Sequence, residues 1–320
     1  MQHDIRKAPA LCAIVAAFLP ASALQAAEES PGFADEVLGR WDLTVQGTDG
    51  AYPSWLEIRL RTEKQLMAEF VGRFGSRRHA AQASFTDGRL QVRIPVQYES
   101  GGDELVFEGS LAGGRLSGQT RIGAGDSVAW SGVRAPLLGQ TDVAGWGEPI
   151  AMIGDDLAGW QPRFSQHAGC WTVEDGILRA TPPCVDIISE ARFDDFRLHL
   201  EFRYPPGSNS GVYLRGRYEV QIQDDRGKAV DPLRIGGVYG FIAPRTNAAG
   251  VPHEWQTYDI ELIGRRITVS LNGIEIISRR EIPGITGGAL DSDEGSPGPL
   301  MLQGDHGPIE FRNIVVTPGR

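Results

Sequence analysis

The sequence predicts an all-β protein made of antiparallel strands. Turn-forming residues are frequent, with 41 Gly and 20 Pro among 320 residues, and long helical patterns are few. Apolar and polar residues alternate over many short segments, which is the period of a strand with one buried face. Pairs such as Asp87-Gly88 and Asn272-Gly273 separate these segments, and Asp-Gly and Asn-Gly are strong hairpin signals.

Residues 36–135 are predicted to form a small antiparallel barrel or sandwich domain, because eight short strand-like segments follow one another with turn signals between them. These segments cover residues 41–45, 54–60, 65–71, 80–85, 90–96, 104–111, 115–122 and 128–133. Residues 136–149 contain several Pro and Gly and are interpreted as a linker. Residues 150–318 are strand-rich again and are predicted to form a second domain.

Residues 1–27 are typical of a secretory signal peptide. Arg6 and Lys7 precede a short apolar core over 11–24, and small residues over 21–26 offer cleavage sites. The core is too short for an ordinary membrane span, and no later segment is apolar enough for one. We therefore expect a periplasmic or secreted protein without a transmembrane segment.

Two cysteines, Cys170 and Cys184, remain after the predicted cleavage, and they flank the hairpin signal Asp175-Gly176. A disulfide is plausible in an oxidising compartment. Two buried free thiols are an equal alternative, since spacing does not establish the Cα separation that a disulfide requires.

The net charge of -10 argues against binding of a phosphate backbone, which requires a basic surface. A local basic run over residues 73–79 is interpreted as a solvated loop. We expect no nucleic-acid partner.

Two strand-like segments, 197–204 and 218–224, each carry polar side chains in one row and apolar side chains in the other. A polar row costs free energy unless it is solvated or occupied by a ligand. The two rows predict a sheet with a core face and a polar, ligand-binding face. Asn209 and Ser210, between the segments, suit sugar hydroxyls or simply shape a turn.

The ionisable candidates each have two interpretations. Glu219 suits a catalytic base or is a solvated strand residue. Arg203 and Arg215 suit the stabilisation of an oxyanion or enolate, or they pair with acidic neighbours. His306 can titrate near neutral pH and suits acid–base work or metal binding, or it is a hydrogen-bonded loop residue.

Standard catalytic motifs such as a P-loop or a Gly-x-Ser-x-Gly elbow are absent from the sequence. Some jelly-roll glycosidases carry Glu-x-Asp-x-x-Glu on one strand. In the comparable segment, 219–224, Gln221 occupies the place of the Asp, so ordinary retaining hydrolysis is not supported. Glu201 and Glu219 remain a candidate carboxylate pair across neighbouring strands.

The second half of the chain resembles the 3-keto-disaccharide hydrolase family from Ile153 to Thr317, about half of the sequence. The order of several landmarks carries the resemblance. These are 155–160, 171–176, 193–203, 209–211, 218–222, Asp224, 237–239, 254–255, 271–273, 302–303, 306–307 and 311–314. Gln256 departs from the family pattern, which usually has Asn after Glu-Trp.

The resemblance implies a concanavalin-like jelly-roll sandwich with a concave sugar-binding face. It also implies the activity of 3-keto-glucoside 1,2-lyases and 3-keto-2-hydroxy-glucal hydratases. A partner dehydrogenase first oxidises the sugar C3 hydroxyl to a ketone. The C2 proton is then removed, the resulting enolate expels the C1 aglycone, and water adds to the 2-hydroxy-glycal.

Carried onto this sequence, the resemblance implies Glu219 as the base, Arg215 as the enolate stabiliser, and His306 or Asp224 as the acid. The expected substrate-binding residues are Glu201, Arg203, Asn209, Ser210, Gln221 and Gln303. No cofactor is certain. A divalent metal ion can replace Arg, and its candidate ligands are Glu201, Glu219, Asp224 and His306, without diagnostic spacing.

A non-catalytic carbohydrate-binding module on the same scaffold is the rival interpretation, because jelly rolls are often lectins and a fold does not settle function. Lectin faces rely chiefly on aromatic and amide side chains. The predicted face instead contains Glu201, Arg203, Arg215 and Glu219 together, which favours an enzyme.

Overall fold

The computed structural model describes residues 34–96, 103–121, 127–138 and 143–320. The predicted signal peptide lies outside the described residues. Within them, strands and one 3₁₀ turn, η2 (Ala168–Cys170), are the regular elements, which confirms the all-β class. No helix in this part of the chain is long and apolar enough to cross a membrane.

The first half of the described chain is one nine-stranded antiparallel sheet in the order β4-β3-β2-β1-β9-β8-β7-β6-β5. The strands are β1 (Gly39–Gly47), β2 (Gly50–Thr62), β3 (Gln65–Val71), β4 (Arg78–His79), β5 (Gln82–Thr86), β6 (Arg89–Ile94), β7 (Leu105–Ala112), β8 (Arg115–Arg121) and β9 (Ser127–Arg134). All eight strands predicted from the sequence are present, and β4 is added to them.

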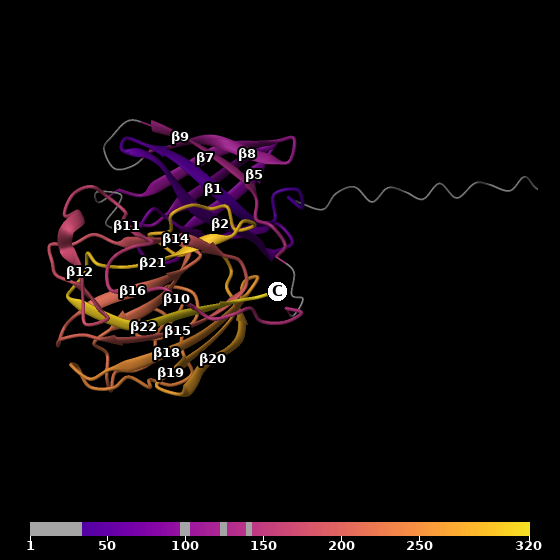
Figure 1. Ribbon diagram of the computed structural model, residues 1–320. Coiled ribbons are helices and arrows are strands. Elements are labelled where there is room, and N and C mark those ends of the chain that lie inside the picture. The colour runs from indigo at the N-terminus through magenta and orange to yellow at the C-terminus, as the bar shows by residue number, and fades with distance from the viewer. Residues whose placement is uncertain (1–33, 97–102, 122–126, 139–142) are drawn as a thin grey trace, which may run out of the picture. The chain divides into compact units, whose positions relative to one another are not determined.

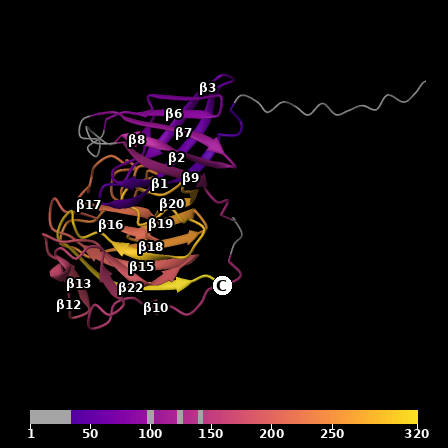
Figure 2. The same cartoon turned by 90° about the horizontal axis from the view of Figure 1, so that it is seen from above.

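This sheet curls until its two ends meet (Figure 2). The amide of Ala80 donates to the carbonyl of Ala68 in β3 at 2.8 Å, and the next amide, of Ala81, donates to Arg93 in β6 at 2.8 Å. The short link between β4 and β5 therefore bonds to both ends of the sheet and closes a small barrel, which covers the edges that would otherwise be exposed.

The second half contains two antiparallel sheets. An eight-stranded sheet has the order β12-β13-β22-β15-β18-β19-β20, with β10 beside β22, and a five-stranded sheet has the order β11-β14-β21-β16-β17. The strands are β10 (Ile150–Ala151), β11 (Trp160–Pro162), β12 (Trp171–Glu174), β13 (Ile177–Ala180), β14 (Ile187–Phe193), β15 (Phe196–Arg203), β16 (Asn209–Leu214), β17 (Tyr218–Gln223), β18 (Gln256–Ile263), β19 (Arg266–Leu271), β20 (Ile274–Glu281), β21 (Gly298–Leu302) and β22 (Ile309–Pro318).

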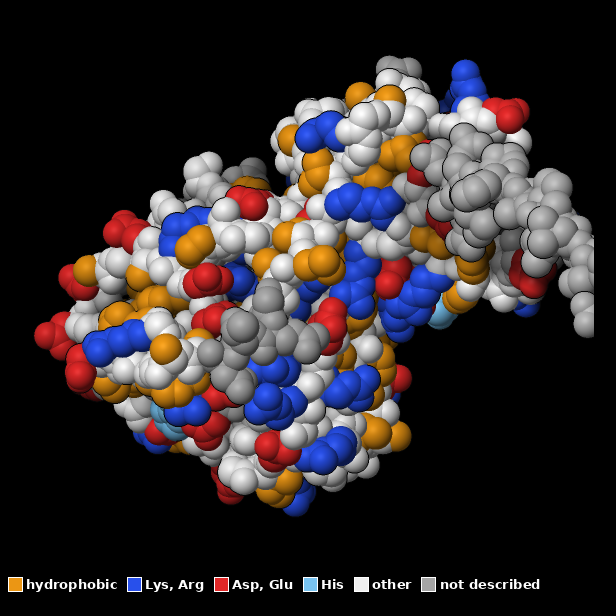
Figure 3. Space-filling view, turned by 90° about the vertical axis from the view of Figure 1, so that its right-hand side faces the viewer, with side chains coloured by type: hydrophobic (Ala, Val, Ile, Leu, Met, Phe, Trp, Pro, Cys, Tyr) orange, Lys and Arg blue, Asp and Glu red, His pale blue; other side chains and the backbone are white. Residues whose placement is uncertain are grey.

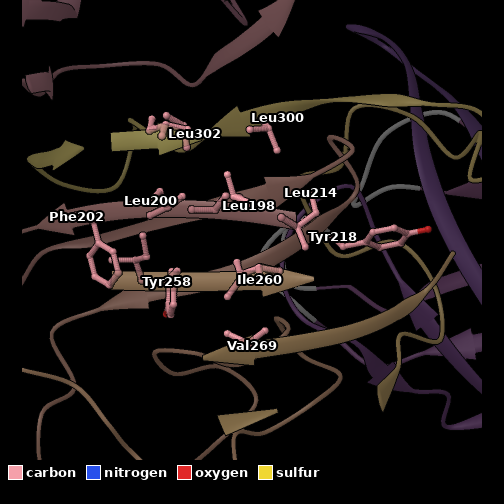
Figure 4. Packing of buried hydrophobic residues seen from close by; sticks show 14 of the residues in the cluster. Leu198, Leu200, Phe202, Leu214, Tyr218, Tyr258, Ile260, Val269, Leu300 and Leu302 are labelled. Carbon is pink, nitrogen blue, oxygen red and sulfur yellow. The ribbon is translucent and has the colours of Figure 1, made fainter. Parts of the chain in front are cut away.

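The two sheets are layered face to face (Figure 1) and enclose one apolar core. Figure 4 shows side chains of this core, among them Leu198 and Phe202 of β15, Leu214 of β16 and Leu302 of β21. Side chains alternate along each strand, so the residues between these core positions point away from the core. This is the jelly-roll sandwich that the resemblance implied.

The predicted hairpins at Asp175-Gly176 and Asn272-Gly273 are confirmed. Asp175 has φ 52° and Gly176 has φ 70°, and the second pair has φ 52° and 75°. Two consecutive positive φ values define the tight turn whose twist matches antiparallel strands, and Asp, Asn and Gly adopt them at least cost.

The described residues form one compact unit. The division into domains at 36–135 and 150–318, with a linker over 136–149, stays a prediction.

Cys170 and Cys184 form a disulfide, with their Cα atoms 5.2 Å apart. Of the two alternatives that the sequence left open, the structure has the bonded one. The bond joins Cys170, the last residue of η2, to the buried Cys184.

We predict that the double variant Cys170→Ser, Cys184→Ser loses about 3 kcal/mol of unfolding free energy, the loop-closure entropy of a loop of about 15 residues. Urea unfolding of the oxidised protein and of the variant measures this loss. Adding a reductant should destabilise the wild type alone. An equal response of both proteins to the reductant would contradict the prediction.

Candidate active site

A polar pocket of about 250 Å³ lies on the outer face of the five-stranded sheet. Its walls come from strands β16 and β17 of that sheet, from Asp186 and Gln303 at the ends of β14 and β21, and from the loops that cover it. The residues that line it are Phe74, Gly75, Arg163, Asp186, Asn209, Tyr213, Glu219, Gln221, Tyr239, Gly287, Gly288, Gln303, Asp305 and His306. Five of the residues predicted from the sequence are brought together here, namely Glu219, His306, Asn209, Gln221 and Gln303.

Glu219 is the most buried carboxylate of this pocket, with 3% of its surface exposed. Its neighbours in β17, Tyr218 and Val220, belong to the core, so strand alternation directs Glu219 to the pocket face. Its side chain extends across Gly211 of β16, where a Cβ would lie 2.4 Å from Oε1 of Glu219. The absence of a side chain at Gly211 is therefore what lets the carboxylate lie there.

Burial raises the pKa of Glu219 to about 8, because the charged form loses its hydration. A hydrogen bond from the hydroxyl of Tyr213, 2.9 Å from Oε2, opposes this shift, as does the positive charge of His306. A carboxyl group with a pKa near neutral pH exchanges protons readily at that pH, which is the property that a general base or acid needs.

The hydroxyl of Tyr213 lies within hydrogen-bond distance of two acceptors, Oε2 of Glu219 and the carbonyl of Gly287 at 3.0 Å. One hydroxyl proton serves one acceptor. When Glu219 is protonated it can donate to Tyr213, which then donates to Gly287. When Glu219 is ionised the Tyr213 proton turns to the carboxylate. Tyr213 therefore satisfies Glu219 in both protonation states.

His306 lies half-exposed at the pocket, with its Nδ1 bonded to the carboxylate of Asp305. This hydrogen bond raises the pKa of His306, and the nearby Glu219 adds to the increase. The imidazole is therefore held closer to its protonated form, and its Nε2 is the atom not bonded to Asp305. A protonated imidazole beside a pocket can deliver a proton or stabilise a negative oxygen.

Arg163 is the arginine that lines this pocket. Its Nη1 lies 3.0 Å from Oδ2 of Asp186, and the amide of Gly304 donates to the other oxygen of Asp186 at 3.2 Å. Burial raises the pKa of Asp186, which the charge of Asp305 reinforces and Arg163 opposes. The pair places a guanidinium group in the pocket with a fixed orientation.

Two amide side chains of the pocket have buried, unused acceptors. Oδ1 of Asn209 and Oε1 of Gln303 have no hydrogen-bond partner among the residues that the structure describes. A buried unpaired acceptor costs free energy, and a ligand that carries hydroxyl groups would remove that cost. Gln221, in contrast, uses its Oε1 to accept from the amide of Ile222 at 3.0 Å.

Glu201 and Arg203 lie outside this pocket, contrary to the expectation that they share a site with Glu219. Both are in β15, which is in the eight-stranded sheet, whereas β17 is in the five-stranded one. Glu201 accepts from Arg312 at 2.7 Å, and Arg203 pairs with Glu310. These two residues are thus paired with the neighbouring strand β22, while Arg197 and His199 of the same row pair with Glu261 and Asp259 of β18. Glu201 forms no carboxylate pair with Glu219.

Arg215, Asp224 and Ser210 are also placed away from the pocket lining, which corrects the expectation for each. The guanidinium of Arg215 is buried and donates to Asp194 at 3.0 Å and to the carbonyl of Gly264. Asp224 accepts from a backbone amide at 2.9 Å. The hydroxyl of Ser210 donates to the backbone of Gln303 at 2.8 Å and ties β16 to the end of β21.

The four candidate metal ligands named from the sequence are not assembled, because Glu201 and Asp224 are not among the lining residues of the pocket that holds Glu219 and His306. Among the described residues, no group of three or more His, Cys, Asp or Glu side chains could hold a metal ion.

Sequence reasoning missed Arg163, Asp186, Tyr213, Tyr239 and Asp305. Tyr213 had a detectable signal, since it alternates with the apolar Val212 and Leu214 and so belongs to the pocket face of β16. The others lie in irregular segments, where no periodicity says which way a side chain points.

A second, larger cavity of about 770 Å³ is lined by several arginines, including Arg40 and Arg265. Arg40 pairs with Glu281, and Arg265 lies 3.0 Å from Glu294 and 2.9 Å from the carbonyl of Pro136. Figure 3 likewise shows acidic side chains interspersed with the basic ones on the face that it draws. These ion pairs are structural, so we place the site at the pocket around Glu219.

A jelly-roll sandwich whose polar pocket holds a buried acid and an imidazole, together with a glycosidase-type family match, supports a carbohydrate-active enzyme of the glycosidase type. The chain belongs to the family of the 3-keto-alpha-glucoside-1,2-lyase-like domain, whose model matches residues 148–317. This match confirms the resemblance found in the sequence. Among curated proteins no match was found.

Several solved structures are similar to parts of this chain. A candidate glycosyl hydrolase from Parabacteroides distasonis ATCC 8503 is 29% identical, with 52% of this chain and 82% of that chain covered and a TM-score of 0.46. Another from the same organism is 25% identical, with 54% and 100% covered and a TM-score of 0.44. A Bacillus licheniformis beta-glucanase is 12% identical, with 55% and 100% covered and a TM-score of 0.34.

Because the pKa of Glu219 is raised from 4.5 to about 8 in the folded protein, folding favours its protonated form. Its contribution to stability is complete below about pH 4.5 and is lost as the pH rises to about 8. We predict that the unfolding free energy of the wild type falls over this range relative to that of Glu219→Gln, which does not titrate. Urea unfolding at several pH values measures both curves, and parallel curves would contradict the raised pKa.

Proposed function

We propose that the protein cleaves 3-keto glycosides by elimination and rehydration. The observation that carries the proposal is a buried carboxyl group, Glu219, whose pKa is raised to about 8 and which shares its pocket with unpaired acceptors for sugar hydroxyls. The family match over residues 148–317 supports the same chemistry.

The reaction begins with a ketone at C3, which makes the C2 proton acidic. The base takes that proton, and the electron pair left on C2 forms an enolate with its charge on the C3 oxygen. The enolate collapses, so that the ketone re-forms, a C1=C2 double bond forms, and the bond from C1 to the aglycone oxygen breaks. Addition of water returns a hydroxyl to C1 and a proton to C2. The net change is hydrolysis of the glycosidic bond.

Glu219 takes the role of base in its ionised form, and Tyr213 holds the carboxylate. His306, whose pKa is raised by its hydrogen bond to Asp305, donates a proton to the leaving aglycone oxygen. Arg163 replaces Arg215 as the cation that stabilises the enolate oxygen, because it is the guanidinium that lines the pocket. Asn209 and Gln303 accept hydrogen bonds from the ring hydroxyls.

An ordinary retaining hydrolysis needs a second free carboxylate roughly 5 Å from the first. The two other carboxylates of the pocket are engaged, since Asp186 pairs with Arg163 at 3.0 Å and Asp305 is bonded to His306. Gln221 occupies the remaining place beside Glu219 in β17. This arrangement supports proton abstraction by one carboxyl group over a two-carboxylate mechanism.

The substrate requires a sugar C3-dehydrogenase as a functional partner, because an unoxidised glycoside has no acidic C2 proton. We also propose that the protein works in the periplasm or outside the cell. The bond between Cys170 and Cys184 supports this location, since disulfides persist in oxidising compartments.

The direct test incubates the mature protein with a 3-keto-glucoside in deuterated water and follows the reaction by NMR. We predict release of the aglycone with deuterium at C2, and no reaction of the unoxidised glucoside. Hydrolysis of both substrates without deuterium at C2 would replace the proposal by ordinary glycoside hydrolysis. Binding of both substrates without turnover would favour the non-catalytic carbohydrate-binding module.

We predict that Glu219→Gln lowers kcat by about 10²- to 10⁴-fold, the usual contribution of a general base. In the wild type kcat/KM should rise with pH up to about 8, as Glu219 ionises. The matched control is Glu275→Gln, which removes an exposed partner of Arg245 on β20 and should change kcat less than twofold. Equal activities of the two variants would remove Glu219 from the base role.

A further inference from the structure

The pocket has one wall that comes from outside the family-matched region. The loop between β3 and β4, residues 72–77, places Phe74 and Gly75 in the lining of the pocket that contains Glu219. The family model begins only at residue 148, so this wall is an addition of the N-terminal barrel.

Close backbone contacts hold this loop against the second half of the chain. The amide of Gly288 donates to the carbonyl of Arg73 at 2.9 Å. A Cβ on Gly287 would lie 2.1 Å from the oxygen of Gly75, and one on Gly240 would lie 2.8 Å from the amide nitrogen of Arg77. Side chains at these glycines would push the loop away, so the loop is docked by direct backbone contact.

Apolar contacts at the base of the loop hold it as firmly. Trp55 and Val71 are barrel-strand residues, yet both are packed in the core of the second half. The rings of Trp55 and Phe241 pack edge to face, with their centroids 5.3 Å apart. The guanidinium of Arg77 lies over the same Phe241 ring, 5.4 Å from its centroid. The wall is therefore a fixed part of the pocket.

Phe74 is the exposed member of this wall, with 40% of its surface accessible, whereas Glu219 has 3%. The guanidinium of Arg73 lies over its ring at 5.1 Å from the centroid, which orients the ring. An accessible aromatic ring at a pocket with convergent polar groups is a surface for the apolar face of a ligand ring.

A small pocket of about 250 Å³ suits one sugar ring, with its C2 proton near the buried Glu219. The leaving group must then extend to the exposed part of the pocket, where His306, as the proposed acid, reaches the glycosidic oxygen. Phe74 is the exposed aromatic residue of the same lining.

We propose that Phe74 stacks against the ring of the leaving group, so that the N-terminal barrel selects glycosides whose aglycone is a second sugar ring over those with a small alcohol. This inference rests on the proposed function, because it assigns the second ring to the aglycone side of the reaction.

The test compares Phe74→Ala with the wild type on a 3-keto-disaccharide and on methyl 3-keto-glucoside. Loss of the stacking contact should raise KM for the disaccharide by about three- to tenfold, with a smaller change for the methyl glycoside and little change in kcat. Phe74→Trp should restore the low KM. The matched control Leu60→Ala removes a side chain of similar exposure, 41%, at the end of β2 and should alter neither substrate. Equal changes for both substrates, or none, would overturn the inference.

A binding measurement separates this inference from the proposed function. With ring-labelled phenylalanine, the NMR signal that disappears in Phe74→Ala identifies Phe74 among the 12 Phe residues. A shift of that signal by the unoxidised disaccharide, without turnover of any keto substrate, would leave the stacking site standing and remove the proposed reaction. Turnover of keto substrates, with no shift of that signal and no change in KM for Phe74→Ala, would support the proposed reaction and remove the stacking site.

Discussion

The burial of the Glu219 carboxyl group is the constraint on which the rest of the site depends. Core packing of Tyr218 and Val220 turns Glu219 to the outer face of the five-stranded sheet, and the covering segments exclude water from it. A carboxyl group in such a place must either bind a proton or find partners. Gly211 leaves the space that the side chain fills, and Tyr213 supplies a hydroxyl group that suits both protonation states. The unusual pKa that makes Glu219 chemically useful is thus a direct result of how the sheet packs.

Two groups of charged residues in the second half lie in distinct environments. On the eight-stranded sheet, Glu201 and Arg203 pair with residues of the adjacent strand β22 at a partly exposed surface, where ion pairs contribute little to stability and their charges cancel. Around the pocket, Asp305 and Asp186 each bind a single cationic partner, His306 or Arg163. These partners remain in the lining, so their positive charges stay available to a ligand that carries a developing negative oxygen.

The N-terminal barrel is joined to the second half through its core and through the pocket. Trp55 and Val71 belong to the apolar cluster of the second half, and the loop after β3 contacts backbone atoms of residues 287 and 288 directly. A wall that is fixed at its base can present an aromatic ring at the pocket without rearrangement on binding, which lowers the entropic cost of recognition. The barrel is in this way part of the site, although it carries none of the proposed acid–base groups.

The sequence by itself determined the strands, the tight hairpins, the family and the outward direction of Glu219 and Gln221, because alternation and turn chemistry are local properties of the chain. It also brought Asn209, Gln303 and His306 into the list of candidates. Only the tertiary structure decided which strands share a sheet. The segments around Glu201 and Glu219 have the same alternating pattern, yet they belong to different sheets, since periodicity records which face a side chain occupies and not which strand lies next to it. For the same reason the sequence contained no signal for Arg163 and could not show that Phe74 and Glu219 line the same pocket, because contacts between distant segments are set by packing.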